Sequence, residues 1–144
     1  MSGIGPSVVA MNLISVRLIT DDVDRLVAFY ARLTGATVDR PVADFAELRT
    51  PNGTLAIGSS RTVALFGPGS AEPAANRSAI VELLVDDVDA VHAAVQGWAE
   101  VVQAPTTMPW GNRSLLLRDP DGTLVNVFAP ATEAAREKFA RFSR

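Results

Sequence analysis

The sequence predicts an α+β protein built from two tandem βαβββ modules, which form a curved mixed sheet, plus a C-terminal helix. An acidic helix start occurs twice, as Asp22-Val23-Asp24 and Asp87-Val88-Asp89, with an offset of 65 residues. A turn sequence also occurs twice, as 48–55 (LRTPNGTL) and 117–124 (LRDPDGTL), with an offset of 69 residues. Two separate matches in the same order indicate an internal duplication.

The first module is expected over residues 12–66, after an N-terminal arm over residues 1–11. Leu13 to Thr20 alternates and is rich in β-branched residues, which indicates a half-buried strand. Acidic residues then favour a helix start, apolar residues recur at spacings of three and four, and Gly35 ends the helix. Further strands are predicted at 37–40, 44–50, 54–58 and 61–66.

A polar linker over residues 67–78 (GPGSAEPAANRS) precedes the second module, which spans residues 79–130. A strand at Ala79 to Val85 leads to a helix that Gly97 ends. Strands follow near 100–104, 113–118 and 123–128. Thr132 can cap a last helix within residues 131–144, running to about Phe142. The whole forms one structural domain.

The composition excludes several classes of protein. A net charge of −3 gives no basic surface for nucleic acid, and no apolar run is long enough to cross a membrane. The chain has no cysteine, and His92 is its one histidine, so thiolate and multi-histidine metal sites are excluded. The N-terminus lacks the basic start of a signal peptide, so we expect a cytoplasmic protein.

Two stretches carry a family resemblance. Residues 16–30 (VRLITDDVDRLVAFY) end a helix with a Phe-Tyr pair, and residues 110–130 (WGNRSLLLRDPDGTLVNVFAP) contain a Trp-Gly pair and an Asp-Pro-Asp-Gly turn. Together with the duplicated order of elements, they resemble the vicinal-oxygen-chelate superfamily, which includes glyoxalase I, extradiol dioxygenases and bleomycin-resistance proteins. The resemblance implies two four-stranded sheets that form a cup, and a homodimer.

The resemblance also locates a metal site. In metal-using relatives, His, Glu or Gln on the first and last strand of each module hold a divalent ion. The corresponding positions here are Ser15, Ile80, Asn126 and, in the first module, either Ile57 or Ala64. The two neutral oxygen donors, Ser15 and Asn126, do not bind a divalent cation strongly enough to offset the free-energy cost of dehydrating it. We therefore expect no metal and no other cofactor.

The same positions suggest a ligand site. Arg17 and Glu82 correspond under the offset of 65 and lie two residues beyond Ser15 and Ile80, on the same faces of their strands. They either form an ion pair across the cup or point to the outside as unrelated charges. The full set of expected ligand-binding residues comprises Ser15, Arg17, Glu82, Met108, Trp110, Arg113 and Asn126.

Three functions remain open from the sequence. The favoured one is a metal-independent protein that binds a small organic molecule in the cup, as bleomycin-resistance proteins do. The second is a lyase, isomerase or dioxygenase of the same superfamily that uses a non-standard metal site or acid–base chemistry by Glu47 or Glu82, with Asp44 a further possible base. The third is a structural or regulatory domain whose cup is filled by side chains.

Overall fold

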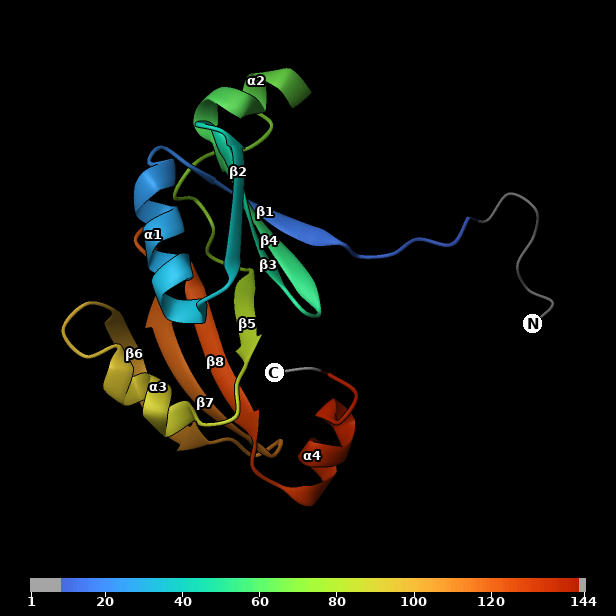
Figure 1. The fold of residues 1–144 in the computed structure, drawn as a ribbon, viewed down its shortest axis with the longest axis vertical. Helices are drawn as coiled ribbons and strands as arrows, with labels where there is room; N and C mark the ends of the chain where they lie inside the picture. Colours follow the sequence, from blue (N-terminus) through green and yellow to red (C-terminus); the bar gives the residue numbers. More distant parts are fainter. Residues whose placement is uncertain (1–8, 143–144) are drawn as a thin grey trace.

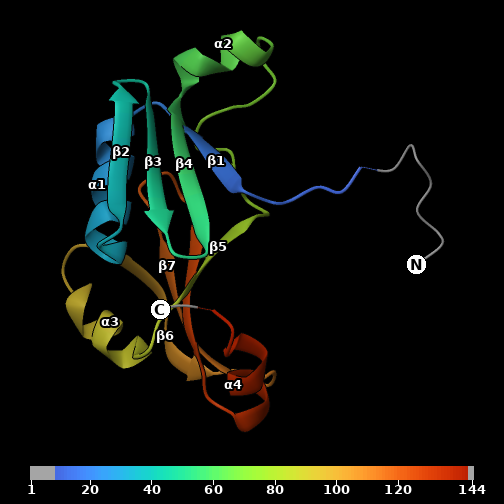
Figure 2. The ribbon, with the colours of Figure 1, turned by 45° about the vertical axis from the view of Figure 1, so that its right-hand side comes forward.

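The computed structural model describes residues 9–142, and it contains two four-stranded sheets stacked end to end (Figures 1 and 2). The first module contains β1 (Ser15–Thr20), α1 (Val23–Thr34), β2 (Thr37–Val42), β3 (Phe45–Thr50), β4 (Gly53–Ser59), a 3₁₀ turn (Ser60–Thr62) and α2 (Val63–Phe66). The second contains β5 (Ile80–Leu84), α3 (Val88–Ala94), β6 (Glu100–Thr107), β7 (Asn112–Arg118), β8 (Leu124–Pro130) and α4 (Glu133–Phe139).

The two sheets have the same topology, which confirms the predicted duplication. Their strand orders are β1-β4-β3-β2 and β5-β8-β7-β6, and in each sheet the first strand is parallel to the last. The first helix of each module begins at the predicted carboxylates. The side chain of Asp22 accepts a hydrogen bond from the backbone N–H of Arg25, and Asp87 accepts one from Ala90.

The core lies on the helix-bearing face of each sheet. Leu48 and Ile57 lie beneath α1, and Leu115, Leu117 and Val127 are their counterparts in the second module. The two modules share this core, because α1 also reaches residues of the second module. Phe29 on α1 stacks edge-on against Trp98, with ring centroids 5.7 Å apart. Trp98 is therefore a packing residue between modules.

Residues 61–66 are helical, so the predicted strand at this position is wrong. Ser59 caps the turn by accepting a hydrogen bond from the backbone N–H of Arg61, and α2 follows directly. The cap ends β4 at Ser59, so the chain does not continue as a further strand. A helix thus follows the last strand in both modules, since α4 occupies the same place after β8.

The pairing of strands also decides which residue of the first module corresponds to Asn126. Glu82 pairs with Asn126, and its repeat equivalent Arg17 pairs with Ala56. The second hairpin contains one more residue than the first, which shifts the offset from 69 to 70 after the turn. The residue of the first module that corresponds to Asn126 is therefore Ala56. Ile57 faces the core, and Ala64 lies on α2.

Each sheet also has an open face, which we define as the face opposite α1 or α3. Strand alternation places Ser15, Arg17, Glu47 and Ala56 on the open face of the first sheet. Ile80, Glu82, Asn126 and Phe128 lie on the open face of the second sheet. Within residues 9–142, the helices are too short or too polar to cross a membrane.

Candidate functional site

A large groove lies along β5, at the junction of the two modules. It has a volume of about 780 Å³, and we call it the β5 groove. Its walls come from β5, the end of α1, the tip of the β3–β4 hairpin and α4. The lining is mostly aliphatic and aromatic, with Phe128, Phe139 and Phe142 at one end and Arg49 and Glu82 as its charged residues. The size and composition are those of a site for a small organic molecule.

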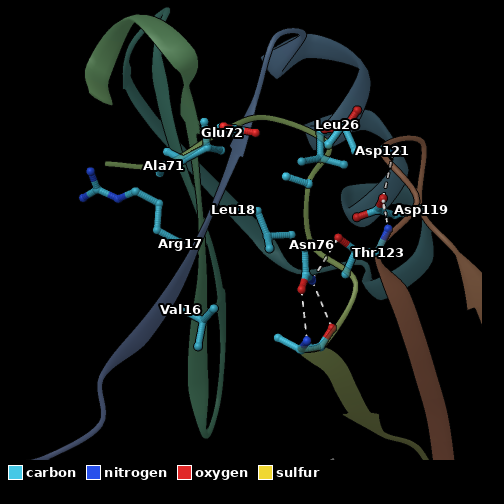
Figure 3. A pocket seen from close by; sticks show the side chains of 14 residues that line it. Val16, Arg17, Leu18, Leu26, Ala71, Glu72, Asn76, Asp119, Asp121 and Thr123 are labelled. Atoms are coloured by element: carbon cyan, nitrogen blue, oxygen red, sulfur yellow. Dashed lines mark hydrogen bonds between the residues drawn. The ribbon is translucent and has the colours of Figure 1, made fainter. Parts of the chain in front are cut away.

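A smaller cavity of about 280 Å³ lies along β1, and we call it the β1 groove (Figure 3). The repeat relates the two grooves. The β1 groove is bounded by β1, Leu26 and the turn at 119–123, whereas the β5 groove is bounded by β5, Val91 and the turn at 50–54. In Figure 3, the linker crosses beside β1, and Asn76 points into the space next to Leu18. The chain itself therefore covers the first of these two grooves.

Glu82 is the expected site residue that lines the β5 groove. Its Oε2 atom accepts a hydrogen bond of 2.9 Å from the amide of Asn126. Its Oε1 atom has no hydrogen-bond partner among residues 9–142, and the side chain is exposed. The Asn126 amide fixes the carboxylate, which can accept a hydrogen bond from an N–H or O–H group of a ligand.

The positions at which relatives hold a metal do not fit one here. Ala56 and Ile80 carry no donor atom, and Asn126 uses its amide nitrogen to contact Glu82. Ser15 supplies one neutral hydroxyl on the other sheet. Among residues 9–142, no group of three or more His, Cys, Asp or Glu side chains converges in a way that could hold a metal ion. The usual divalent ion would therefore lack both charge neutralisation and a sufficient number of ligands.

The ion pair between Arg17 and Glu82 does not form within the chain, so this hypothesis is wrong for one copy of the protein. The Arg17 guanidinium lies over the rings of Phe45 and Phe66, at 4.7 and 5.1 Å from their centroids. Each charge faces the open side of its own sheet, and a different local partner orients each of them. Figure 3 shows Arg17 on the opposite side of β1 from Leu18 and Asn76.

Arg113, one of the expected ligand-binding residues, is instead bound to a carboxylate of its own chain. Its guanidinium binds both carboxylate oxygens of Asp89 at 2.9 Å, on the helix-bearing face of the second sheet. This bidentate hydrogen bonding lowers the pKa of Asp89. Met108 and Trp110 lie in the turn between β6 and β7, and Trp110 is 65% exposed. Neither residue lines the β5 groove.

The possible general bases differ in their surroundings. Hydrogen bonds from Arg61 and Ser59 lower the pKa of Asp44, which makes this carboxylate a weaker base. Glu47 faces the open side of the first sheet, between Asp39 and Ala56, and lines neither groove. Glu82 is thus the candidate base that meets a large cavity.

A buried hydrogen bond beside the β1 groove was not anticipated from the sequence. The hydroxyl of Tyr30 donates to Asp119 Oδ2 at 2.7 Å, and Asp119 Oδ1 accepts from the backbone N–H groups of Asp121 and Thr123. Burial, reinforced by the Asp119 carboxylate, raises the pKa of Tyr30 far above its usual range. This hydrogen bond joins α1 of the first module to the turn of the second.

Comparison with known proteins gives a consistent family and fold. The family model described as Glyoxalase/Bleomycin resistance protein/Dioxygenase superfamily matches residues 12–127. A glyoxalase/bleomycin resistance protein/dioxygenase from Nocardioides is 22% identical, with a TM-score of 0.73 and 89% of each chain covered. No curated protein matches the sequence.

Two further solved structures have the same fold. A glyoxalase/bleomycin resistance protein/dioxygenase family enzyme from Burkholderia phytofirmans PsJN is 19% identical, with a TM-score of 0.71, covering 81% of this chain and 96% of its own. TioX from Micromonospora sp. ML1 is 26% identical, with a TM-score of 0.64, covering 83% of this chain and 99% of its own.

Proposed function

Because the chain belongs to the Glyoxalase/Bleomycin resistance protein/Dioxygenase superfamily, we propose that it is a cytoplasmic, homodimeric protein that binds a small organic molecule without a metal. The β5 groove is the observation that carries this proposal. A cavity of about 780 Å³ with aliphatic and aromatic walls is large enough for a ligand of drug-like size. A cavity of this size favours a binding protein over a purely structural domain.

The chemistry of the groove defines the ligand further. Its aromatic end, at Phe128 and Phe139, suits an apolar or flat group. The Glu82 carboxylate, held by Asn126, suits a group that donates a hydrogen bond. A largely apolar molecule with one N–H or O–H group therefore matches the lining better than a polyanion does.

A fluorescent probe of that chemistry tests the proposal. N-phenyl-1-naphthylamine is apolar, carries one N–H group and brightens when it leaves water. We expect saturable binding of one probe per chain, weakened about tenfold by Phe139→Ala, since losing about 1.4 kcal/mol of contact energy corresponds to tenfold. Phe66→Ala is the matched control, because Phe66 lies outside the groove and is 70% exposed. Equal affinities of the two variants would contradict the proposed location.

The proposed metal independence is tested by measuring the metal content of the protein and the effect of added metal on its stability. Elemental analysis of the protein purified without chelator should find far less than one divalent ion per chain, and added Zn²⁺, Mn²⁺ or Ni²⁺ should leave the thermal midpoint unchanged. A stoichiometric ion that raises the midpoint would overturn this part of the proposal, because a ligand that binds the native state stabilises it.

A further inference from the structure

The β1 groove combines aliphatic walls with acidic side chains. Its walls include Leu18, Leu26 and several alanines of the linker. Three carboxylates also line it, those of Glu72, Asp119 and Asp121. Among residues 9–142, Arg17 is the one basic residue in the lining, and its guanidinium lies over two phenylalanine rings on the other side of β1 (Figure 3). The side chains that face the groove are therefore acidic or apolar.

The two carboxylates of the turn at 119–123 differ in their partners. Asp119 is satisfied within the protein, because Tyr30 and two backbone N–H groups donate to it. Asp121 Oδ1 lies 3.5 Å from Arg25 Nη2, which is longer than an ordinary hydrogen bond. Its Oδ2 atom is buried and has no hydrogen-bond partner within residues 9–142. An unpaired buried carboxylate oxygen costs free energy, which a ligand that donates an N–H group would recover.

The turn itself does not require the charge of Asp121. Under the offset of 69, Asp121 corresponds to Asn52, and the Pro-Asn-Gly turn joins β3 to β4 as Pro-Asp-Gly joins β7 to β8. Asp121 lines the β1 groove, and Asn52 lines the β5 groove. The negative charge is therefore a property that distinguishes the β1 groove from its counterpart.

The linker supplies a second carboxylate on the opposite side of the groove. In Figure 3, the side chain of Glu72 points from the linker toward Leu26 and Asp121. Glu72 is exposed and forms no ion pair within residues 9–142. Two carboxylates from distant parts of the chain thus border one aliphatic space, and no cation of the described residues lies between them.

The size and walls of the groove restrict which cation fits. Its volume of about 280 Å³ exceeds the ~150 Å³ in which a benzene ring fits, so one ring with a short substituent can enter. No group of acidic side chains within residues 9–142 converges closely enough to hold a metal ion. No aromatic residue lines the groove, so a quaternary ammonium would lack its usual partner. A primary ammonium has three N–H donors, which carboxylates accept.

We propose that the β1 groove is a second binding site, which takes a small organic molecule with a primary ammonium group. The ammonium lies between Glu72 and Asp121, whose side chain is 15% exposed and so within reach, and the apolar body lies against Leu18 and Leu26. The ligand would contact the linker, α1 and the turn of the second module together. Its binding should therefore raise the thermal midpoint. This inference does not rest on the function proposed for the β5 groove.

Benzylamine, which is protonated at neutral pH, is a probe of this chemistry. In nuclear magnetic resonance spectra, we expect it to shift the amide signals of Asn76 and Thr123, which line the groove. Benzyl alcohol lacks the charge, and benzyltrimethylammonium lacks the N–H donors. Each should bind about tenfold more weakly, which corresponds to the loss of one charge-assisted hydrogen bond. Equal binding of benzyl alcohol, or shifts confined to other parts of the protein, would overturn the proposal.

Two charge-removing variants test the residues. Glu72→Gln and Asp121→Asn should each weaken benzylamine binding about tenfold. Asp121→Asn should keep the turn intact, because Asn52 occupies the same turn position in the first module, and circular dichroism checks the fold. Glu100→Gln is the matched control, since Glu100 is exposed and lines neither groove. An equal loss in the control would show attraction by net charge alone and would overturn the site.

A variant that fills the groove gives an independent test. Ala75 is exposed on the linker and lines the groove, so Ala75→Leu should leave the fold intact and abolish the shifts at Asn76 and Thr123. Unchanged benzylamine binding by Ala75→Leu would contradict the location.

The two grooves are separated by a competition experiment. Benzylamine should leave the binding of N-phenyl-1-naphthylamine unchanged, and Phe139→Ala should leave the binding of benzylamine unchanged. Competition between the two probes would place benzylamine in the β5 groove and overturn the second site. A protein that binds benzylamine as expected but not N-phenyl-1-naphthylamine would contradict the proposed function alone.

Discussion

The two contacts between the modules are related by the duplication, yet hydrogen bonds among residues 9–142 cross only one of them. The other contains the β5 groove. At the first contact, the turn of the second module meets α1, where Tyr30 donates to buried Asp119 and Arg25 donates to the carbonyl oxygen of Pro120. At the second contact, the corresponding residues are Val95, Thr50 and Ala90, which form no such hydrogen bonds across the modules. The difference shows how a duplicated protein can join its two modules at one contact and leave a groove at the counterpart.

The largest loss of stability is expected when Asp119 is replaced by Ala. The variant loses three hydrogen bonds and leaves the buried hydroxyl of Tyr30 without an acceptor, so we expect the free energy of unfolding to fall by about 3 kcal/mol. Thr50→Ala, at the corresponding exposed turn position, should cost less than about 1 kcal/mol. Urea denaturation of both variants measures the difference. Equal losses would mean that the two contacts carry equal weight.

A pH titration of Tyr30 tests the buried hydrogen bond directly. Tyr30 is the one tyrosine in the chain, so the absorbance of tyrosinate reports that residue alone. The folded state holds the proton more tightly than the unfolded state, whose pKa is near 10.0. Stability from this group is therefore complete below pH 10 and is lost as the pH rises above it, by up to about 1.4 kcal/mol per pH unit.

Tyrosinate absorbance should accordingly appear only when alkali unfolds the protein, at the same pH as the loss of circular dichroism. Tyr30→Phe should show a flatter dependence of stability on pH above 10. A reversible titration near pH 10 in the folded protein would contradict the buried hydrogen bond.

The smallest expected effects concern the helix that follows the last strand of each module. Phe66 of α2 provides one of two rings beside Arg17, and Phe66→Ala should cost about 0.5 kcal/mol. Phe139 of α4 contacts Phe128 at 5.1 Å between centroids, and Phe139→Ala should cost about 1 kcal/mol or more. Thermal unfolding can compare the two. The reverse order would mean that α2 is the more firmly held helix.

Much of the fold could be predicted because its signals are local and occur twice. The carboxylates of Asp22 and Asp87 cap their helices as expected, and the Pro-Asn-Gly and Pro-Asp-Gly turns join their strands. The helical segment at 60–66 was not predicted, because it begins with a 3₁₀ turn that Ser59 caps, and α2 follows that turn without a side-chain cap of its own. The first-module position that corresponds to Asn126 is Ala56 and not Ile57, because the second hairpin contains one more residue. Only the pairing of the strands reveals this insertion.

The candidate site was predicted in part. The repeat offset singled out Glu82 and placed it on the strand that forms the groove, and the structure adds its hydrogen bond to Asn126. The partner of Arg113 was missed, because Asp89 had been read as a helix-start charge and nothing in the chain order links them. The groove itself depends on how the two modules meet, and no local pattern contains that information.

The parallel pairing of the first and last strand in each module has a consequence for how the chain folds during synthesis. β1 has no partner until β4 has left the ribosome, and β5 has none until β8 follows, so each sheet closes late and over a long loop. The first sheet can close while the second module is still being made. The bond from Tyr30 to Asp119 then forms near the end, as the step that joins two finished halves.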